Sequence, residues 1–315
     1  MKKRIKNTLH FIDLFAGIGG FRIALESVGA KCVFSSEIDP SASKTYSINF
    51  HEQPSGDITK IDSKQIPVHD ILCAGFPCQP FSIGGYRKGF EDTRGTMFFE
   101  IERILTDKKP KTFILENVMG ILSHDEKNTI NIIRKKLKSI GYDIFEKILD
   151  AKDFGLPQNR RRWFCVGFRK DLDILTFDFP SGTKLTKSVY DLLENDVTGH
   201  DVTKIAAKHI KSHYKKFKKT SQSLTIASEV RPSRCSMRDD GLVPCLTAKM
   251  GTGGNNVPYL VNHNRFVSLG ECLSLQGFPK NYKLTNNYSE ALKQIGNSVT
   301  VPVIEEIIKK IILKA

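Results

Sequence analysis

Apolar runs of strand length alternate with helical segments along the first half of the chain. Residues 9–15 have the pattern of a buried strand and residues 21–28 that of a helix ending at Gly29, with the glycine-rich corner 16–20 between them. The alternation fades from about residue 172. Such alternation predicts an α/β protein, in which ligands bind at the carboxyl ends of the strands.

The glycine-rich corner does not match a dinucleotide-binding fingerprint, because Arg22 stands where the third glycine is required. It would instead let a cofactor without a pyrophosphate lie close to the backbone. The next predicted strand ends at Glu37, 17 residues after Gly20, where a carboxylate could grip a ribose diol. Asp57 falls where a third strand should end and could accept a bond from an exocyclic amine. Either acid could equally be a solvated loop residue.

A Pro-Cys turn follows the apolar run 71–73. Cys78 lies between Pro77 and Pro80, each of which fixes its own backbone φ and lacks an amide donor. A thiol on a stiff turn at the end of a strand is placed to act as a nucleophile, although an unpaired cysteine can also be a small apolar filler. The glycine-hinged and charged segment 84–95 that follows predicts a moving lid.

A second acid and a run of arginines accompany this turn. Glu116 ends another apolar run, which predicts that it lies at the same sheet edge as Cys78. Arg160 and Arg162 precede the predicted strand 163–168, and period-two alternation would point both side chains the same way. They could be a solvated face, but that arrangement favours a shared anionic target.

The charge balance indicates a polyanionic partner. The chain has 48 Lys and Arg against 34 Asp and Glu, a net charge of +14. Neither end has the pattern of a basic amphipathic helix, so nucleic acid is a better candidate for the partner than a membrane surface. The seven scattered cysteines form no disulfide framework or metal knuckle, so we expect reduced thiols and no bound metal. No signal peptide or membrane-spanning stretch is evident, which predicts a cytoplasmic protein.

The second half of the chain holds the basic segments. Residues 204–219 carry seven lysines with two aromatic residues interleaved, either a solvated charge run or a nucleic-acid surface. Further on, arginines and a loop rich in glycine and hydrogen-bonding side chains suit base edges, although the loop could also be a turn-rich hairpin. The DNA-contact candidates here are Arg231, Arg234, Arg238, Lys249, Thr252, Gly253, Gly254 and Asn255. The apolar helix predicted at 303–313 should return to the first domain.

Five stretches, in this order, resemble the DNA cytosine-5 methyltransferase family, especially its bacterial restriction-modification members. They are residues 13–20 (DLFAGIGG), 75–80 (GFPCQP), 116–118 (ENV), 158–162 (QNRRR) and 296–299 (GNSV). The resemblance implies an α/β fold with a doubly wound, mixed and mostly parallel sheet of the class I S-adenosylmethionine-dependent methyltransferases. We expect a catalytic domain at 1–175, a smaller and irregular target-recognition domain at 176–284, and a segment at 285–315 that completes the catalytic domain.

The resemblance also implies roles for single residues. Cys78 would be the catalytic thiol, Glu116 the acid that holds the cytosine ring, and Arg160 and Arg162 partners of the base and its neighbourhood. Matching cofactor positions are Phe15, Ala16, Gly17, Gly19, Gly20, Glu37, Ile38, Asp57, Ile58, Pro77, Asn297, Ser298 and Val299. Gln79, Ser82 and Arg94 would contact DNA. Two positions depart from the family: Ile38 replaces an aromatic residue found in some relatives, and Cys245 replaces the threonine common before Leu246.

The activity implied is methylation of cytosine C5 at a specific site in double-stranded DNA with S-adenosylmethionine, through a flipped-out base and a covalent Cys78 adduct. We expect a monomer that acts separately from any cognate restriction endonuclease. A related enzyme that acts on transfer RNA is the alternative within the same chemistry; a catalytically silent DNA-binding regulator is the alternative from another class.

Overall fold

The computed structural model describes residues 8–77, 97–195, 197, 202–221, 224–252, 256–285 and 287–314. Predicted site residues outside these ranges are Cys78, Gln79, Ser82, Arg94, Gly253, Gly254 and Asn255, and the predicted lid 84–95 lies outside them too. The chain divides into two compact units. Unit 1 comprises residues 1–149, 161–180 and 303–315, and unit 2 comprises 150–160 and 181–302. This grouping places 285–302 with unit 2; the division into functional domains stays a prediction.

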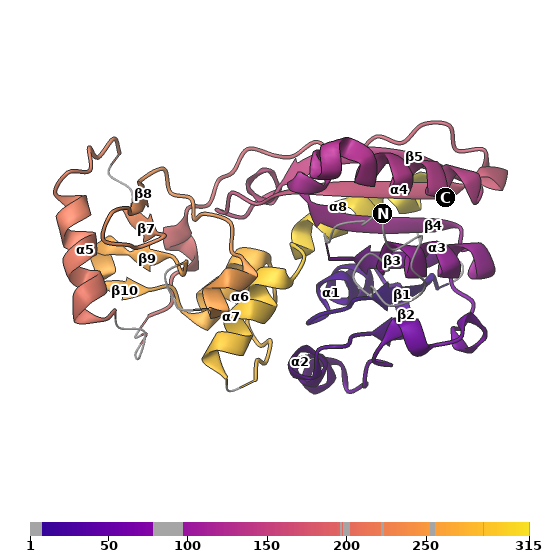
Figure 1. Ribbon diagram of the computed structural model, residues 1–315, viewed down its shortest axis with the longest axis horizontal. Helices are drawn as coiled ribbons and strands as arrows, with labels where there is room; N and C mark the ends of the chain where they lie inside the picture. The colour runs from indigo at the N-terminus through magenta and orange to yellow at the C-terminus, as the bar shows by residue number, and fades with distance from the viewer. Residues whose placement is uncertain are drawn as a thin grey trace. The chain divides into compact units, whose positions relative to one another are not determined.

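Unit 1 is built on a six-stranded sheet with the order β2-β1-β3-β4-β6-β5 (Figure 1). The strands are β1 (His10–Leu14), β2 (Lys31–Ser36), β3 (Ile71–Gly75), β4 (Thr112–Val118), β5 (Tyr142–Asp150) and β6 (Arg161–Arg169). The first four pair in parallel, and β6 is antiparallel to β4. The order reverses at β1, and the carboxyl ends of strands beside such a switch point form the ligand-binding crevice of doubly wound sheets. The predicted fold class is confirmed.

Helices cover the sheet because its strands are apolar on both faces. Leu14 and Leu72 point to one face, and Phe11 and Cys73 alternate to the other, yet all four are fully buried. The helices of unit 1 are α1 (Gly20–Ser27), α2 (Pro40–Phe50), α3 (Met97–Lys108), α4 (Asn128–Ser139) and α8 (Val301–Lys314). In α8 the isoleucines at 304, 307, 308 and 311 are buried, and residues from 303 onward belong to unit 1. The predicted return of the last helix is confirmed.

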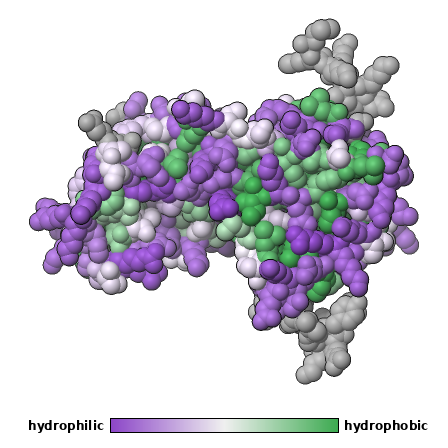
Figure 2. Space-filling view, turned by 90° about the horizontal axis from the view of Figure 1, so that it is seen from above, coloured by the Kyte–Doolittle hydropathy of each residue, from purple (hydrophilic) through white to green (hydrophobic). Residues whose placement is uncertain are grey.

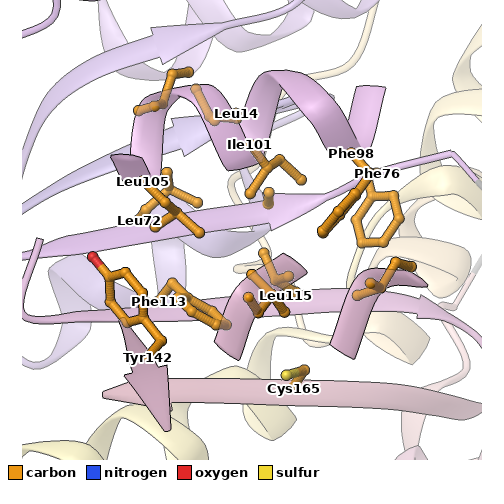
Figure 3. Packing of buried hydrophobic residues seen from close by; sticks show 14 of the residues in the cluster. Leu14, Leu72, Phe76, Phe98, Ile101, Leu105, Phe113, Leu115, Tyr142 and Cys165 are labelled. Atoms are coloured by element: carbon orange, nitrogen blue, oxygen red, sulfur yellow. The ribbon is translucent and has the colours of Figure 1, made fainter. Parts of the chain in front are cut away.

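The core beside α3 positions the end of β3. Figure 3 shows Ile101 and Leu105 of α3 directed toward the strand residues Leu72 and Leu115. At the end of this cluster, the Phe76 ring lies 6.1 Å from that of Phe98. The residue just after β3 is therefore anchored by core packing rather than left to a loose loop.

One predicted strand is absent. We expected a third strand to end near Asp57, but the third strand is β3, and Asp57 instead precedes the short 3₁₀ helix η1 (Ile58–Lys60). Its side chain accepts hydrogen bonds from the backbone N–H and the hydroxyl of Thr59, at 3.0 and 2.8 Å. The prediction was wrong because the segment before Asp57 is mostly exposed and polar, so it lacks the apolar alternation of a strand.

Unit 2 carries a small antiparallel sheet of order β10-β9-β7-β8. Its strands are β7 (Ile226–Ser228), β8 (Ser236–Arg238), β9 (Tyr259–Leu260) and β10 (Arg265–Phe266), and its helices are α5 (Lys204–Tyr214), α6 (Leu269–Gln276) and α7 (Tyr288–Asn297). α5 packs on one face of this sheet, where its Ile210 joins a hydrophobic cluster with Ala227 of β7 and Tyr259 of β9. Strands this short carry little periodicity in the sequence. In the part of the chain that the structure describes, no helix is long and apolar enough to cross a membrane.

Candidate functional site

The carboxyl ends of β3 and β4 are joined side by side. Gly75 pairs with Glu116 in the parallel register, and the buried Asn117 amide donates a 2.8 Å hydrogen bond to the carbonyl of Phe76. The oxygen of the same amide accepts from the backbone N–H of Val118 at 2.8 Å. This clamp fixes the backbone up to Pro77, the last described residue before Cys78.

Glu116 and Arg162 form an ion pair at this edge. Arg162 Nε lies 3.2 Å from Glu116 Oε1, and the two side chains are only 13% and 10% exposed. The pair joins neighbouring strands, since Val118 of β4 lies opposite Arg162 of β6. A carboxylate held by a guanidinium in such a shielded place keeps one orientation.

Arg160 lies outside the strand that contains Arg162, and a shared anionic target for the two arginines stays a prediction. β6 begins at Arg161, and Arg160 belongs to unit 2, where it is 3% exposed. Its guanidinium donates to the carbonyls of Leu246, Gly296 and Ser298 at 2.6, 3.2 and 2.5 Å. Period-two alternation failed because the strand geometry starts one residue later.

The glycine-rich corner is a tight turn at the end of β1. Gly17 and Gly19 have φ angles of 55° and 78°, and Phe15 adopts a φ of 56°, which costs a non-glycine residue about 1 kcal/mol or more. A Cβ on Gly19 would lie 2.3 Å from the Phe50 ring, so this position has no room for another side chain. Ala16 donates to the carbonyl of Ser36 at 2.9 Å, which ties the corner to β2.

Glu37 faces this corner from the end of β2. Its two carboxylate oxygens accept from the backbone N–H groups of Gly17 and Asp39, at 2.7 and 2.8 Å. Burial raises the pKa of the Glu37 carboxyl, and these two N–H donors only partly offset the effect. Each oxygen can accept a second bond, so the carboxylate could hold a diol while keeping its protein contacts. Beside it, the Ile38 side chain is 68% exposed, an apolar surface open to a flat ring.

The other cofactor candidates lie in different settings. Gly20 is the first residue of α1, and Ile58 is 3% exposed within the core of unit 1. Asn297, Ser298 and Val299 belong to unit 2, where Asn297 is exposed and the other two are buried. The structure thus brings Phe15, Ala16, Gly17, Gly19 and Glu37 together in unit 1.

Asp13 is a buried acid that sequence reasoning missed. It is fully buried on β1, two residues before the glycine-rich corner, and neither carboxyl oxygen has a hydrogen-bond partner among the described residues. Burial raises its pKa well above the ordinary value, which the nearby Arg22 only partly offsets. The signal was an aspartate inside an otherwise apolar strand, where an acid is kept at a cost in stability.

A polar pocket of about 820 Å³ lies in unit 2. Its described lining includes four of the predicted DNA-contact residues, namely Arg231, Arg234, Arg238 and Lys249. Ion pairs hold two of these arginines: Arg234 lies 3.0 Å from Glu229, and Arg238 Nε lies 2.7 Å from Asp240. Thr252 is exposed but does not line the pocket. Figure 2 shows a largely hydrophilic surface over this unit, on the left.

A lysine row runs along α5, on the face away from the small sheet. Lys204, Lys208, Lys211 and Lys215 recur at helical spacing, and all four are exposed. The opposite side of the helix is buried at Ile210. The pocket is lined by other residues of unit 2, and none of them belongs to α5. The lysines of α5 and the basic residues of the pocket are therefore two distinct sets.

Within the described residues, no group of three or more His, Cys, Asp or Glu side chains could hold a metal ion. The six cysteines there are free thiols, and Cys32, Cys73, Cys165 and Cys272 are buried. Burial raises the pKa of the Cys32 thiol to about 12, with nearby Asp13 acting in the same direction. Buried thiols of this kind are poor nucleophiles.

A doubly wound sheet with an oriented acid and a glycine-rich corner at its strand ends is the arrangement of a cofactor-dependent transferase. The family described as C-5 cytosine-specific DNA methylase matches residues 9–313. The chain belongs to this family, in its bacterial restriction-modification branch, and is a DNA (cytosine-5-)-methyltransferase.

Curated relatives agree with this assignment, and a solved structure agrees with the fold. Type II methyltransferase M.HaeII of Haemophilus aegyptius is 46% identical over 299 residues, covering 94% of this chain and 90% of that protein. M.HhaI of Haemophilus parahaemolyticus is 43% identical over 308 residues, covering 95% and 93%. The fold matches the crystal structure of a putative DNA modification methyltransferase encoded within an E. coli prophage, with a TM-score of 0.74, 23% identity, and coverage of 97% and 99%.

Proposed function

We propose that this enzyme methylates C5 of a specific cytosine in double-stranded DNA with S-adenosylmethionine, through a flipped-out base and a covalent bond from Cys78 to C6. The observation that carries the proposal is the Glu116–Arg162 pair at the end of β4, beside the clamped backbone that leads into Cys78. It supplies an oriented acid at the sheet edge where the sequence predicts Cys78 to lie.

The chemistry explains why an acid and a thiol are needed together. Cytosine C5 is a poor nucleophile, and addition of a thiolate at C6 makes it enamine-like. Glu116 would bond N3 and the exocyclic amine, stabilising the charge that the ring takes up, while Arg162 keeps its carboxylate in place. The bound cofactor supplies an electrophilic methyl group. Loss of the C5 proton and expulsion of the Cys78 thiolate then restore the aromatic ring.

Access to the ring requires base flipping, because C6 is enclosed in a stacked duplex. Unstacking costs a few kcal/mol. The predicted lid 84–95 would close over the flipped base, and Gln79, Ser82 and Arg94 would contact the DNA around it.

The residues at the end of β1 fit the cofactor. Glu37 would accept from the ribose diol, the glycine turn would allow close backbone approach, and the exposed Ile38 side chain would cover the adenine. Asp57 would accept from the exocyclic amine while it caps η1. The remaining proposed cofactor contacts are Phe15, Ala16, Gly19, Gly20, Ile58, Pro77, Asn297, Ser298 and Val299.

The pocket of unit 2 would read the target sequence. Arg231, Arg234, Arg238 and Lys249 line it, and the segment from Thr252 through Gly253, Gly254 and Asn255 follows Lys249 in the chain. Arginine and lysine are suited to the acceptor edges of guanine in the major groove. We also propose a monomeric, cytoplasmic enzyme whose cognate endonuclease, where one exists, acts separately; the Type II names of its relatives support the pairing.

Incubation with methyl-labelled S-adenosylmethionine and duplex DNA, followed by nucleoside analysis, tests the proposal. We expect label in 5-methylcytosine alone, at one motif that sequencing of DNA from an expressing host identifies. Label in N4-methylcytosine or N6-methyladenine would refute it. Preferential labelling of transfer RNA in competition would favour the alternative substrate, and binding without any transfer would favour a silent regulator.

A further inference from the structure

We propose that Arg160 is a positioning residue that couples cofactor binding to DNA binding, by joining the DNA-reading segment of unit 2 to its cofactor segment. The inference rests on the proposed function, which assigns Lys249 to DNA and residues 297–299 to the cofactor. It replaces a direct role for Arg160 at the base. Arg162 remains the arginine that contacts Glu116.

The guanidinium of Arg160 spans two segments that lie far apart in sequence. One terminal nitrogen donates to the carbonyl of Leu246 at 2.6 Å, and the other donates to the carbonyls of Gly296 and Ser298 at 3.2 and 2.5 Å. Leu246 lies just before η8 (Ala248–Gly251), which contains Lys249, and Ser298 is itself a cofactor candidate. The planar fork therefore contacts both segments at once.

The backbone of Arg160 is held as firmly as its side chain. Its N–H donates to the Asp150 carboxylate at 2.9 Å, and its carbonyl accepts from Ala151 at 3.1 Å. Nearby, the Gln158 amide accepts from the Leu246 N–H at 3.0 Å and donates to the carbonyl of Leu275 at 2.8 Å. The anchor is thus rigid, and a shift of either joined segment must strain it or move the other segment.

The two segments also touch directly. A Cβ on Gly296 would lie 2.1 Å from the carbonyl carbon of Thr247, and one on Gly251 would lie 2.4 Å from the carbonyl oxygen of Ser289. The backbone of η8 is therefore packed against both ends of α7 with no space for a methyl group. Packing this tight transmits a displacement instead of absorbing it.

The consequence is positive coupling. A cofactor that fixes the position of residues 297–299 also fixes the carbonyls that Arg160 holds, and so holds η8 in the position that DNA contacts. DNA then meets a segment that is already in place. Because coupling free energy is reciprocal, DNA must strengthen cofactor binding by the same factor.

The test compares DNA affinity with and without S-adenosylhomocysteine in wild type and in Arg160→Lys. The probe is a labelled duplex that carries the methylated motif read from host DNA. We expect the cofactor product to tighten DNA binding at least about tenfold in wild type, and less than about threefold in the variant, because an ammonium cannot bridge both segments as a fork does. Arg161→Lys, an exposed neighbour, is the matched control and should keep the wild-type ratio.

Each outcome of this comparison either supports or refutes the coupling role of Arg160. An unchanged ratio in folded Arg160→Lys overturns the coupling role, as does a variant that weakens both single-ligand affinities but keeps the ratio, which would be a merely structural effect. If Arg160→Lys does not fold by circular dichroism, hydrogen exchange in wild type tests the same junction: S-adenosylhomocysteine should slow exchange of the amides at 246–252, and unchanged exchange there refutes the proposal. If the wild-type enzyme methylates C5 but shows no coupling, this inference alone is refuted. If the wild-type enzyme does not methylate DNA, the proposed function is refuted.

Discussion

Glu116 combines a catalytic assignment with a structural position that can be checked. Its carboxylate lies on a central strand and is oriented by Arg162 at 3.2 Å. We predict that Glu116→Gln lowers the single-turnover rate of methyl transfer by about a hundredfold or more, because the amide cannot stabilise the charge at N3. DNA binding should stay close to wild type, and circular dichroism checks that the variant is folded, because the shielded partner Arg162 loses its counter-charge. The exposed Glu126→Gln is the control, and equal rates in the two variants would remove Glu116 from the site.

Glu37 should make cofactor binding depend on pH. Burial raises the pKa of the Glu37 carboxyl in the folded protein. Protonated Glu37 therefore stabilises the folded state fully below the ordinary glutamate pKa, and this stabilisation is lost as the pH rises through the raised pKa. A diol needs the ionised form. We therefore predict that cofactor affinity falls as the solution is acidified through that window, by up to about tenfold for each pH unit. Calorimetric titration of wild type and Glu37→Gln checks it; the same pH slope in both proteins would refute the assignment.

The surroundings of some single residues could not be predicted from the sequence. Alternation placed Arg160 with Arg162, whereas in the folded chain Arg160 binds three carbonyls, two of them from the chain near residue 297. A side chain's partners over that sequence separation are set by tertiary packing, which leaves no local signal. The place of Glu37 just after β2 was predictable, because the apolar run before it marks a strand; its ligand role stays a proposal.

At the scale of elements, the contact between β3 and β4 determines how the Pro-Cys turn begins. Asn117 donates to the carbonyl of Phe76 in a buried setting. We predict that Asn117→Asp lowers the free energy of unfolding by about 1–3 kcal/mol, because the donor is replaced by an acceptor that faces another acceptor. Urea denaturation measures it, with exposed Asn131→Asp as the control. Equal stability of the two variants would show that the clamp is dispensable.

The lysine row of α5 offers a test of its own. Its side chains are exposed, and none of them lines the pocket. If they bind phosphates, replacing Lys208 and Lys211 by glutamine should reduce the slope of log affinity against log salt by up to about 1.8, because each phosphate that a lysine neutralises adds about 0.9 to that slope. Replacing Lys135 and Lys138 on α4 is the matched control. An unaltered slope would identify the α5 row as a solvated charge run.

Elements with strong apolar patterns were predictable, and weakly patterned ones were not. The strands β1 to β4 of unit 1 follow buried runs that local sequence reveals, whereas the strand expected near Asp57 is absent. β9 and β10 have two residues each, too few for any periodicity. The second half of the chain was expected to be irregular because its strands are short. Their pairing depends on partners that are distant in the sequence.

At the scale of the whole molecule, the chain leaves unit 1 twice, at residues 150 and 181, and returns the second time through α8. The five family motifs therefore fall into two units: 13–20, 75–80 and 116–118 in unit 1, 296–299 in unit 2, and 158–162 across the boundary. Order along the chain and family resemblance were enough to predict the fold class and the enzyme family. The target sequence was not predictable, because base reading depends on how side chains dock in a groove.

The central claim is that Cys78 attacks C6 of a cytosine in DNA, and covalent trapping tests it most directly. The protein is incubated with S-adenosylmethionine and a duplex in which the target cytosine carries fluorine at C5. Methyl transfer can then proceed, but the fluorine cannot leave as a proton would, so the thiol is not expelled. We predict a stable protein–DNA adduct whose digestion and mass analysis place the base on Cys78, and no adduct with Cys78→Ser. No adduct in wild type, or one on another cysteine, would contradict the account.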